Sequence, residues 1–438
     1  MSDLFDPLLV RAYAADKRYL EKTHIPIVTV SGTFREDVKD WHQLPADDIR
    51  RDIVFSRAHF SMALGVLRQA WGGTTDPTKA WMVDPTNYVA FSQYQSIAMT
   101  ETIGKLIARL PLLQTVKAMI DKFGRSKLPI LKSITPPLLF LTEEVKKPIL
   151  SFHIAAGNLL LEQGKKVIQV ITDPHVRPEY VKHADNENLA LCVFDQKTKD
   201  DAIELAGLSG QHLHASRVIV TGPPIDERIL ASRRYKSGWR SGTLHLCITT
   251  GGIGTNKPEI EQLLETILPQ LRRQDCHLRL LIYAGTQADI ADLVKFLAKD
   301  QKVKINNLSD AKGRLRLIYH PQLFNANELL IQYGFPWAHG FITKPSGDMA
   351  YDAVASGSFL LTLQEWGEWE HSVRAYFEQR GISREAVVDD FMDQITSLMS
   401  TKGQAQSWIE RAMNATHRLE PEFYQGGKNI VKAYQDIK

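Results

Sequence analysis

Cysteine is scarce in this sequence, and long hydrophobic runs are absent. The 438 residues contain only Cys192, Cys247 and Cys276, and their spacing matches no metal site. Two of these cysteines lie in apolar, strand-like runs, where a buried free thiol is the ordinary role, and this usage fits a reducing cytoplasm. No stretch approaches the ~18–20 continuous apolar residues of a membrane-spanning helix. The charged, helical N-terminal stretch is not a signal peptide, so we expect a soluble or peripheral protein.

A strong excess of one charge is also lacking. Lys and Arg number 53 against 50 Asp and Glu, and the net charge of +3 is too small to favour nucleic acid as a partner. The composition, with 44% hydrophobic and 24% charged residues, is ordinary for a soluble globular protein. We find no internal repeat or low-complexity tract. The length exceeds that of a typical single domain, so we expect two domains.

Short β-rich runs alternate with helical patterns through most of the chain. The first series of predicted strands covers residues 51–56, 80–84, 147–153, 166–173, 189–195 and 216–222. The second series covers residues 244–250, 278–285, 315–320, 338–344 and 358–363. Runs that are apolar throughout and separated by helices predict buried parallel strands with helices on both faces. The two series therefore predict an α/β protein with two doubly wound domains, whose ligands bind beyond the carboxyl ends of the strands.

Composition also suggests where the domains begin and end. The segment 226–242 is basic, contains glycines and follows the turn "TGPPID", so we expect it to be the linker. The predicted divisions are residues 1–50 as a helical N-terminal extension with an extra strand, 51–225 as the first domain, 243–405 as the second domain and 406–438 as C-terminal helices. Two such domains facing each other would form an interdomain cleft.

The segment "LHLCITTGGIGTNKPEIEQLLETIL", residues 244–268, is predicted to be a strand, a glycine turn and a helix. The turn contains the residues Gly251, Gly252, Gly254, Thr255 and Asn256. Free backbone N–H groups at a positive helix end can bind an anion, and a phosphate is the usual one. The alternative, that the glycines serve packing at a βα corner, is equally common for such loops.

A second strand–helix junction follows in "FITKPSGDMAYDAVASGSFLL", residues 341–361. Lys344 could reach a phosphate or carboxylate, and Asp352 could accept hydrogen bonds from ribose hydroxyls. Alternatively, Asp348 and Asp352 only complement the positive end of the helix dipole, and Lys344 is solvated. Two such junctions in one domain favour a nucleotide as the ligand.

Together, "TTGGIGTNKPEIEQLLETI" and "ITKPSGDMAYDAVASG" resemble the donor domain of GT-B glycosyltransferases. The nearest types are monogalactosyldiacylglycerol synthases, processive diacylglycerol glucosyltransferases and the lipid II N-acetylglucosaminyltransferase. Their second motif reads "TKPGG-x-T-x-x-E", and the residues that match it are Lys344, Pro345 and Gly347. Ser346 replaces a glycine, Met349 replaces the threonine, and Asp352 takes the place of the glutamate that holds the ribose. The resemblance implies that Ser346, Gly347 and Asp348 also line the nucleotide-sugar site.

Three further segments extend this resemblance. The segment "QEWGEWEHSV", residues 364–373, is similar to the loop that meets the donor sugar, which implies that Glu368 and Glu370 bind sugar hydroxyls. Trp366 or Trp369 could stack on a sugar face, although a solvated acidic helix start is the alternative for this segment. In the first domain, "FSRAHFSMALGVL" resembles the family's first glycine loop with its glycines replaced. The segment 167–195 resembles the family's "TD…H" segment through Asp173.

The resemblance implies a GT-B fold, α/β with two doubly wound Rossmann-like domains facing an interdomain cleft. It implies a UDP-sugar donor, a lipid or lipid-linked acceptor, inversion at the sugar, and no metal or other cofactor. His59 is the expected general base, because an imidazole titrates near pH ~6.5. His153 is expected to act in catalysis or acceptor binding, and Asp173 to orient a histidine or accept the proton. For each histidine the alternative is a capping or packing role at a βα corner.

Residues 101–147 interleave Lys and Arg with Leu, Ile, Met and Phe, as in an interfacial helix on an anionic membrane. Ordinary helices with solvated lysines are the alternative. With the resemblance, this segment predicts a cytoplasmic protein bound peripherally to the inner face of the cytoplasmic membrane. Two other functions stay open, namely a UDP-N-acetylglucosamine 2-epimerase and a non-catalytic GT-B module that binds nucleotide sugars.

Overall fold

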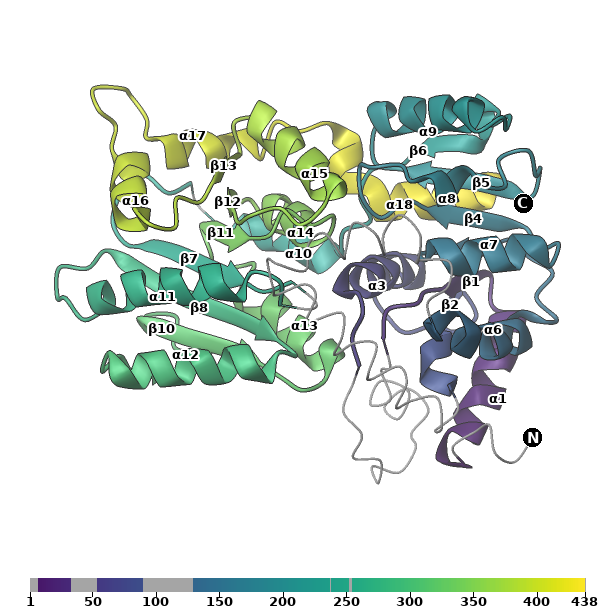
Figure 1. Cartoon of the computed structure of the whole chain (residues 1–438), viewed down its shortest axis with the longest axis horizontal. Coiled ribbons are helices and arrows are strands. Elements are labelled where there is room, and N and C mark those ends of the chain that lie inside the picture. Colours follow the sequence, from purple (N-terminus) through teal and green to yellow (C-terminus); the bar gives the residue numbers. More distant parts are fainter. Residues whose placement is uncertain (1–6, 33–52, 90–128, 237, 252–253, 438) are drawn as a thin grey trace. The chain divides into compact units, whose positions relative to one another are not determined.

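The computed structural model describes residues 7–32, 53–89, 129–236, 238–251 and 254–437 (Figure 1). The chain divides into two compact units. The first comprises Met1–Glu227 and Pro421–Lys438, and the second comprises Arg228–Glu420. The second unit is therefore inserted in the sequence of the first. None of the helices in the described ranges is long and apolar enough to span a membrane.

The described part of the first unit contains a parallel sheet of six strands in the order β2-β1-β3-β4-β5-β6. Its strands are β1 (Ile25–Val28), β2 (Ala80–Val83), β3 (Ile149–Ser151), β4 (Val167–Val170), β5 (Leu189–Val193) and β6 (Val218–Val220). Its helices are α1 (Pro7–Lys22), α3 (Arg57–Trp71), η1 (Pro85–Tyr88), α6 (Pro129–Thr142), α7 (Ile154–Glu162), α8 (Pro178–Val181), α9 (Gln196–Leu208), η4 (Ala215–Arg217) and α18 (Pro421–Asp436). Strands β1 to β5 are buried throughout, as expected for strands covered by helices.

The described part of the second unit contains a parallel sheet of seven strands in the order β13-β12-β11-β7-β8-β10-β9. Its strands are β7 (Leu244–Thr249), β8 (Leu278–Gly285), β9 (Ile305–Asn306), β10 (Leu315–Tyr319), β11 (Gly340–Thr343), β12 (Phe359–Thr362) and β13 (Ser383–Glu385). The helices are α10 (Glu227–Ser232), η5 (Arg233–Tyr235), α11 (Lys257–Leu271), α12 (Ala288–Asp300), α13 (Leu323–Tyr333), α14 (Met349–Ala355), α15 (Glu368–Gln379), α16 (Phe391–Met399) and α17 (Trp408–Ala415). Figure 1 shows α11 and α12 on one face of this sheet and α13 and α14 on the other.

The structure corrects the predicted N-terminal extension. The described part of this range, residues 7–32, belongs to the first unit, because β1 lies within the first sheet, between β2 and β3. Residues 51–56 were predicted as a strand. Their described part forms only one antiparallel bridge, between Val54 and Gly32. The extra strand expected within residues 1–50 is thus a central strand of the sheet, a position against which Pro26 argues. The proline is tolerated because the pairing of β1 with β3 begins only at Ile27.

The predicted linker, residues 226–242, contains α10 and η5, and the second unit already begins at Arg228 within it. The C-terminal helices also divide differently from the predicted boundary. Helix α17 belongs to the second unit, whereas α18 belongs to the first. The Tyr434 hydroxyl on α18 donates a 2.8 Å hydrogen bond to the Pro148 carbonyl, just before β3. Two edge strands of the second sheet, β9 and β13, are short and were not predicted.

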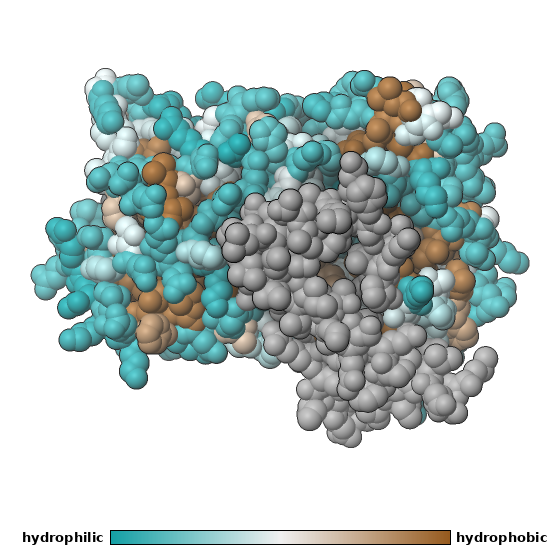
Figure 2. All heavy atoms as spheres, viewed as in Figure 1, coloured by the Kyte–Doolittle hydropathy of each residue, from teal (hydrophilic) through white to brown (hydrophobic). Residues whose placement is uncertain are grey.

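The predicted membrane-facing segment 101–147 lies largely outside the described residues, which resume at residue 129. The described helix α6 packs apolar side chains into the first unit, with Ile134, Leu138 and Leu141 fully buried. Phe140 is exposed, but the Lys17 ammonium lies 4.3 Å from its ring centroid and Tyr13 stacks on it. Figure 2 shows mainly hydrophilic side chains on the visible face of both units. Helix α6 is thus a packed helix of the first unit.

Candidate nucleotide-sugar site and acid–base cluster

The glycine turn of the second unit lies between β7 and α11. The Gly254 N–H donates to the Gly251 carbonyl at 2.9 Å, and Gly254 has a φ of 63°, which favours glycine. Asn256 precedes the first helical residue without capping the helix through its side chain, and Pro258 occupies the first turn. The start of α11 therefore presents backbone N–H groups beyond the carboxyl end of β7, where an anion can bind. Gly252 lies outside the described residues.

The second junction, between β11 and α14, contains the next group of predicted site residues. The Ser346 hydroxyl donates to Asp348 Oδ1 at 2.7 Å and accepts from the Met349 N–H at 3.3 Å. Asp348 precedes the first residue of α14, and Asp352 lies inside that helix. Both carboxylates are buried, with exposed fractions of 7% and 5%. Gly347 is buried in the turn between Ser346 and Asp348.

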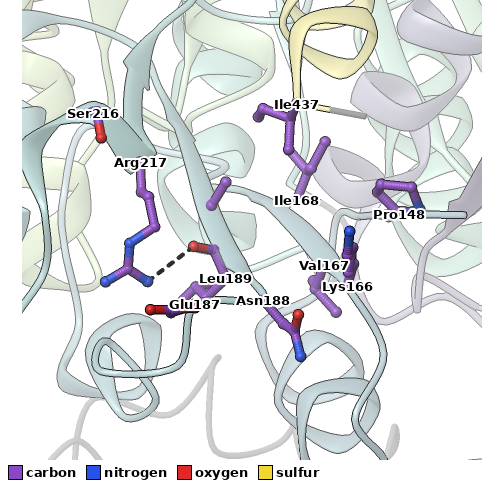
Figure 3. A pocket seen from close by; sticks show the side chains of 11 residues that line it. Pro148, Lys166, Val167, Ile168, Glu187, Asn188, Leu189, Ser216, Arg217 and Ile437 are labelled. Carbon is purple, nitrogen blue, oxygen red and sulfur yellow. Dashed lines mark hydrogen bonds between the residues drawn. The ribbon is translucent and has the colours of Figure 1, made fainter.

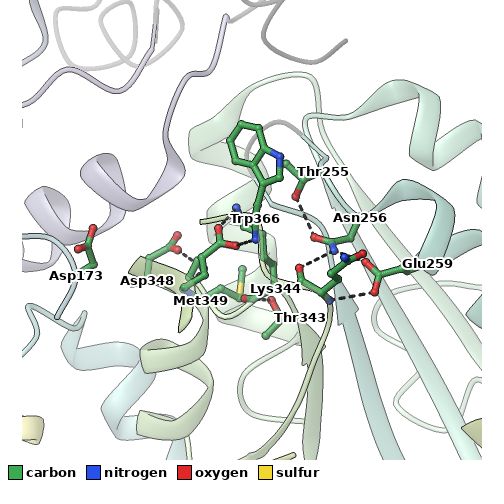
Figure 4. Close-up of polar contacts among 12 residues, drawn as sticks. Asp173, Thr255, Asn256, Glu259, Thr343, Lys344, Asp348, Met349 and Trp366 are labelled. Carbon is green, nitrogen blue, oxygen red and sulfur yellow. Dashed lines mark hydrogen bonds and ion pairs between the residues drawn. The ribbon is translucent and has the colours of Figure 1, made fainter. Parts of the chain in front are cut away.

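Lys344 connects this junction to the glycine turn and to the loop after β12. Its Nζ lies 2.5 Å from Glu370 Oε1, and the Glu370 side chain is fully buried. Glu370 Oε2 accepts the backbone N–H of Trp366, and Lys344 Nζ lies 5.8 Å from the centroid of the Trp366 indole. A Cβ atom added to Gly251 would lie 3.5 Å from Lys344 Cε, so the lysine side chain lies beside the turn. Figure 4 shows Lys344 beneath the Trp366 indole.

The same loop is also joined to α11. Glu259 Oε1 accepts the Gln364 N–H at 3.0 Å, and its other oxygen accepts from the Asn256 amide. The Asn256 amide also donates to the Gln364 carbonyl at 3.1 Å, and the Thr255 hydroxyl donates to Asn256 Oδ1 at 3.0 Å (Figure 4). The junctions after β7, β11 and β12 are therefore linked. Because these strands are adjacent in the sheet, the linked junctions form one site at its carboxyl edge.

The acidic segment after β12 differs in part from the prediction. Glu370 was expected to bind sugar hydroxyls, but its carboxylate is buried against Lys344 and the Trp366 backbone. Glu368 is exposed at the start of α15. The Trp369 ring lies against Gly367, since an added Cβ at this glycine would be 2.3 Å from the ring. In this structure Glu370 thus contacts Lys344 and the Trp366 backbone, and its binding to sugar hydroxyls stays a prediction.

In the first unit, His59 and His153 lie together with their ring centroids 5.2 Å apart in an edge arrangement. His59 Nδ1 lies 3.2 Å from the Val30 carbonyl, which can only accept, so Nδ1 carries the proton and Nε2 the lone pair. His153 caps α7 by accepting the Ala156 N–H at Nδ1, at 3.4 Å, so its Nε2 carries the proton. Burial lowers the pKa of His153 well below its ordinary value, and His59 and Arg177 lower it further. The neighbouring rings thus present an acceptor and a donor nitrogen.

Asp173 follows β4 and is buried, with an exposed fraction of 5%. Its Oδ2 accepts from Arg177 Nη2 at 3.0 Å. Burial raises the pKa of Asp173, and the charges of Arg177 and His175 partly offset this effect. The strands β1, β3 and β4 are adjacent, so the three predicted catalytic residues lie at one carboxyl edge of the first sheet. The structure adds Arg177, which the sequence did not single out.

Asp84 is a second residue that sequence reasoning missed. It follows β2 and accepts the N–H groups of Ser31 and Thr86 at 2.8 and 3.0 Å. The Thr86 hydroxyl also donates to it, at 2.6 Å. Burial raises the pKa of Asp84 to about 7, although these hydrogen bonds lower it. The signal was present in "VDPT", an aspartate that ends a predicted strand before proline, which is a common turn start.

One pocket of the first unit lies at the opposite edge of its sheet, near the amino ends of β3 to β6 (Figure 3). Its lining includes Pro148, Lys166, Leu189 and Arg217. The Arg217 guanidinium donates to the carbonyls of residues 184, 186, 189 and 212. This arginine thus caps backbone groups and offers little to a ligand. No group of His, Cys, Asp and Glu in the described ranges has metal-binding geometry.

Comparison with known proteins identifies the fold. No protein-family profile and no curated protein sequence matches the chain. Among solved structures, the UDP-GlcNAc 2-epimerase of Neisseria meningitidis with bound UDP-GlcNAc is similar at 13% identity and a TM-score of 0.52, covering 94% of this chain and 99% of that chain. Os79 from O. sativa, in complex with U2F and trichothecene, is similar at 10% identity and a TM-score of 0.54, covering 94% and 100%. The chain therefore has the GT-B fold, and the predicted α/β class with two Rossmann-like domains is confirmed.

Proposed function

We propose that the protein is a glycosyltransferase that transfers a hexose or N-acetylhexosamine from a UDP-sugar to a lipid or lipid-linked acceptor. The observation that carries the proposal is the linked site of the second unit, where Lys344 lies beside the glycine turn at the start of α11. A positive helix end beside an ammonium suits a diphosphate. The buried carboxylate of Asp352, in the family's ribose position, supports a nucleoside as the rest of the ligand.

The proposed reaction inverts the sugar and uses no metal. The acceptor hydroxyl oxygen attacks the anomeric carbon, the bond from that carbon to the diphosphate oxygen breaks, and UDP leaves with the bonding electron pair. The hydroxyl proton passes to His59 Nε2. This nitrogen carries the lone pair because the proton of the neutral ring lies at Nδ1, where it is donated to the Val30 carbonyl. Backbone N–H groups of α11 and Lys344 stabilise the charge that grows on the diphosphate.

His153 has a different part in this proposal. Its Nε2 carries a proton while the ring is neutral, so it can donate a hydrogen bond to the acceptor oxygen but cannot remove a proton there. Asp173 and Arg177 form an ion pair close to these rings, so that the negative charge of Asp173 is compensated by the guanidinium of Arg177. The two histidines would hold one hydroxyl between an acceptor and a donor. This arrangement orients the hydroxyl for attack.

The lipid acceptor rests on the family resemblance and on the basic, apolar composition of residues 101–128. A protein with this segment on an anionic surface would work as a peripheral enzyme on the inner face of the cytoplasmic membrane. Flotation with liposomes tests this part separately. Binding to vesicles with anionic lipid but not to neutral vesicles is expected, and no flotation with either kind would refute the membrane association.

The decisive experiment incubates the protein with radiolabelled UDP-sugars and extracted lipids in EDTA. Label is expected in the lipid phase, and His59→Ala should lower turnover by about 10²–10⁴-fold while UDP still raises the melting temperature. His214→Ala is the control, because His214 also lies at the start of a helix but is exposed there, just before η4. Full turnover in His59→Ala would refute the assignment of the base.

A UDP-N-acetylglucosamine 2-epimerase is the second candidate, since one of the similar structures is such an enzyme and the first unit contains an acid–base cluster. The same experiment separates the two functions. An epimerase would convert UDP-N-acetylglucosamine without any acceptor and would leave the lipid phase unlabelled. If UDP, GDP and UDP-sugars all fail to raise the melting temperature, the nucleotide-sugar site itself is wrong.

A further inference from the structure

The Glu370 carboxylate is placed to compete with a bound phosphate. It is fully buried, its Oε1 lies 2.5 Å from Lys344 Nζ, and its Oε2 accepts the Trp366 N–H. The Lys344 side chain has an exposed fraction of only 13%. This ion pair therefore lies in an environment where charges are weakly screened, and its strength depends little on bulk salt.

Lys344 also faces the glycine turn, since its Nζ would lie 3.8 Å from a Cβ atom at Gly251. A phosphate bound at this turn would share the ammonium with Glu370. Two oxygen atoms that accept from one tetrahedral ammonium lie about 4.5 Å apart at ordinary hydrogen-bond lengths. Any phosphate that accepts a hydrogen bond from Lys344 consequently lies close to the buried negative charge of Glu370.

We propose that Glu370 is a counter-charge that weakens the binding of nucleoside diphosphates and so speeds the release of the UDP product. This inference rests on the proposed function of the same site. Glu370 could instead strengthen binding by fixing the Lys344 side chain, but ordering one lysine recovers only its rotamer entropy. Repulsion between like charges at this separation in a partly buried site is the larger effect. Glu370 is thus a residue that sets affinity, without touching the sugar.

The test compares the binding of UDP and uridine by calorimetry at fixed ionic strength. Glu370→Gln should bind UDP at least about tenfold more tightly, which corresponds to about 1.4 kcal/mol, and should bind uridine as the wild type does. Glu378→Gln is the matched control, because it removes the same charge from an exposed position on the same helix, α15. It should leave both affinities unchanged. Equal or weaker UDP binding by Glu370→Gln would overturn the inference.

A second pair of variants covers the case in which Glu370→Gln does not fold. Lys344→Met leaves the buried carboxylate facing the phosphate, whereas Lys344→Met with Glu370→Gln removes both charges. The single variant should bind UDP more weakly than the double variant, and the reverse order would overturn the inference. A wild-type protein that binds no UDP would refute the proposed function, and the inference with it. UDP binding that is insensitive to Glu370 would refute this inference alone.

Discussion

Two stacked histidines in the second unit predict a loss of stability in mild acid. His245 is the second residue of β7. Its ring lies between those of Trp337 and His339, whose centroids are 4.4 and 4.7 Å from its own. His339 Nδ1 accepts a hydrogen bond from the backbone N–H of His245 at 3.1 Å, so a proton on Nδ1 would break this bond. His245 Nδ1 lies 3.2 Å from the Trp337 carbonyl, which leaves Nε2 as the acceptor toward Arg279 at 3.5 Å. Both rings therefore favour the neutral form.

Burial lowers the pKa of His245 to about 4 and that of His339 to about 3. In the unfolded chain both titrate near pH ~6.5, so the unfolded state binds more protons below that pH. The contribution of these two histidines to the free energy of unfolding is fully present above pH ~6.5, and it falls as the pH drops towards 4. Between pH 7 and 5.5 each group would contribute about 1.3 kcal/mol if fully shielded. Since both side chains are partly exposed, we expect a loss of about 1–2 kcal/mol for the pair.

Urea unfolding at constant ionic strength, measured at several pH values from 7 to 5.5, tests this prediction. His339→Asn places an amide oxygen where Nδ1 accepts the His245 N–H but cannot titrate. We expect this variant to lose about half of the pH dependence of the second unit's transition. His277→Asn is the control, because His277 is exposed in the same unit. A pH dependence in His339→Asn equal to that of the wild type would refute the reasoning.

Two further predictions concern the first unit. Gly426→Ala should lower its free energy of unfolding by about 1–3 kcal/mol, because the added Cβ would lie 2.0 Å from the Pro223 carbonyl oxygen. Gly427→Ala, where the nearest atom is 3.7 Å away, should be neutral or stabilising by up to about 1 kcal/mol, and equal losses in both would contradict the prediction. Asp84, with its pKa raised to about 7, favours folding below that pH, and its contribution falls as the pH rises from about 4 to 7. Asp84→Asn should remove this pH dependence of the free energy of unfolding, measured with urea, and should lower that free energy by about 1–3 kcal/mol. An unchanged pH dependence would show that another group titrates.

The main features of the fold could be predicted from the sequence because the parallel strands are buried on both faces. Such strands are continuous apolar runs, as in "LRLLIYAG" of β8, and they differ from the amphipathic helices between them. The position of β1 in the sheet could not be predicted, because Pro26 argues against a central strand and the segment that contains β1 matches no known pattern. The short edge strands β9 and β13 escaped because two or three residues carry no periodicity. Residues 51–56 have the composition of a strand but no neighbouring strand to pair with among the described residues.

The candidate site could be predicted as a location but not as a set of contacts. Glycine turns and helix starts are local signals, so "TTGGIGTN" and "TKPSGD" indicated where an anion could bind. The pairing of Lys344 with Glu370 joins residues far apart in the sequence, and no local pattern specifies it. The same holds for the tautomers of His59 and His153, which depend on one carbonyl and one N–H brought near by the sheet.

The return of α18 to the first unit has a consequence for how the chain folds during synthesis. The first sheet's helix cover is complete only after residues 421–436 have been made, about 190 residues after the rest of that unit. At ordinary rates of translation this delay is about 10–40 s. During that time Pro223 and its neighbours lack the helix that contacts them, while the second unit is contiguous in sequence and can fold as it emerges. The inserted unit is thus expected to complete its fold before the unit that surrounds it in the sequence.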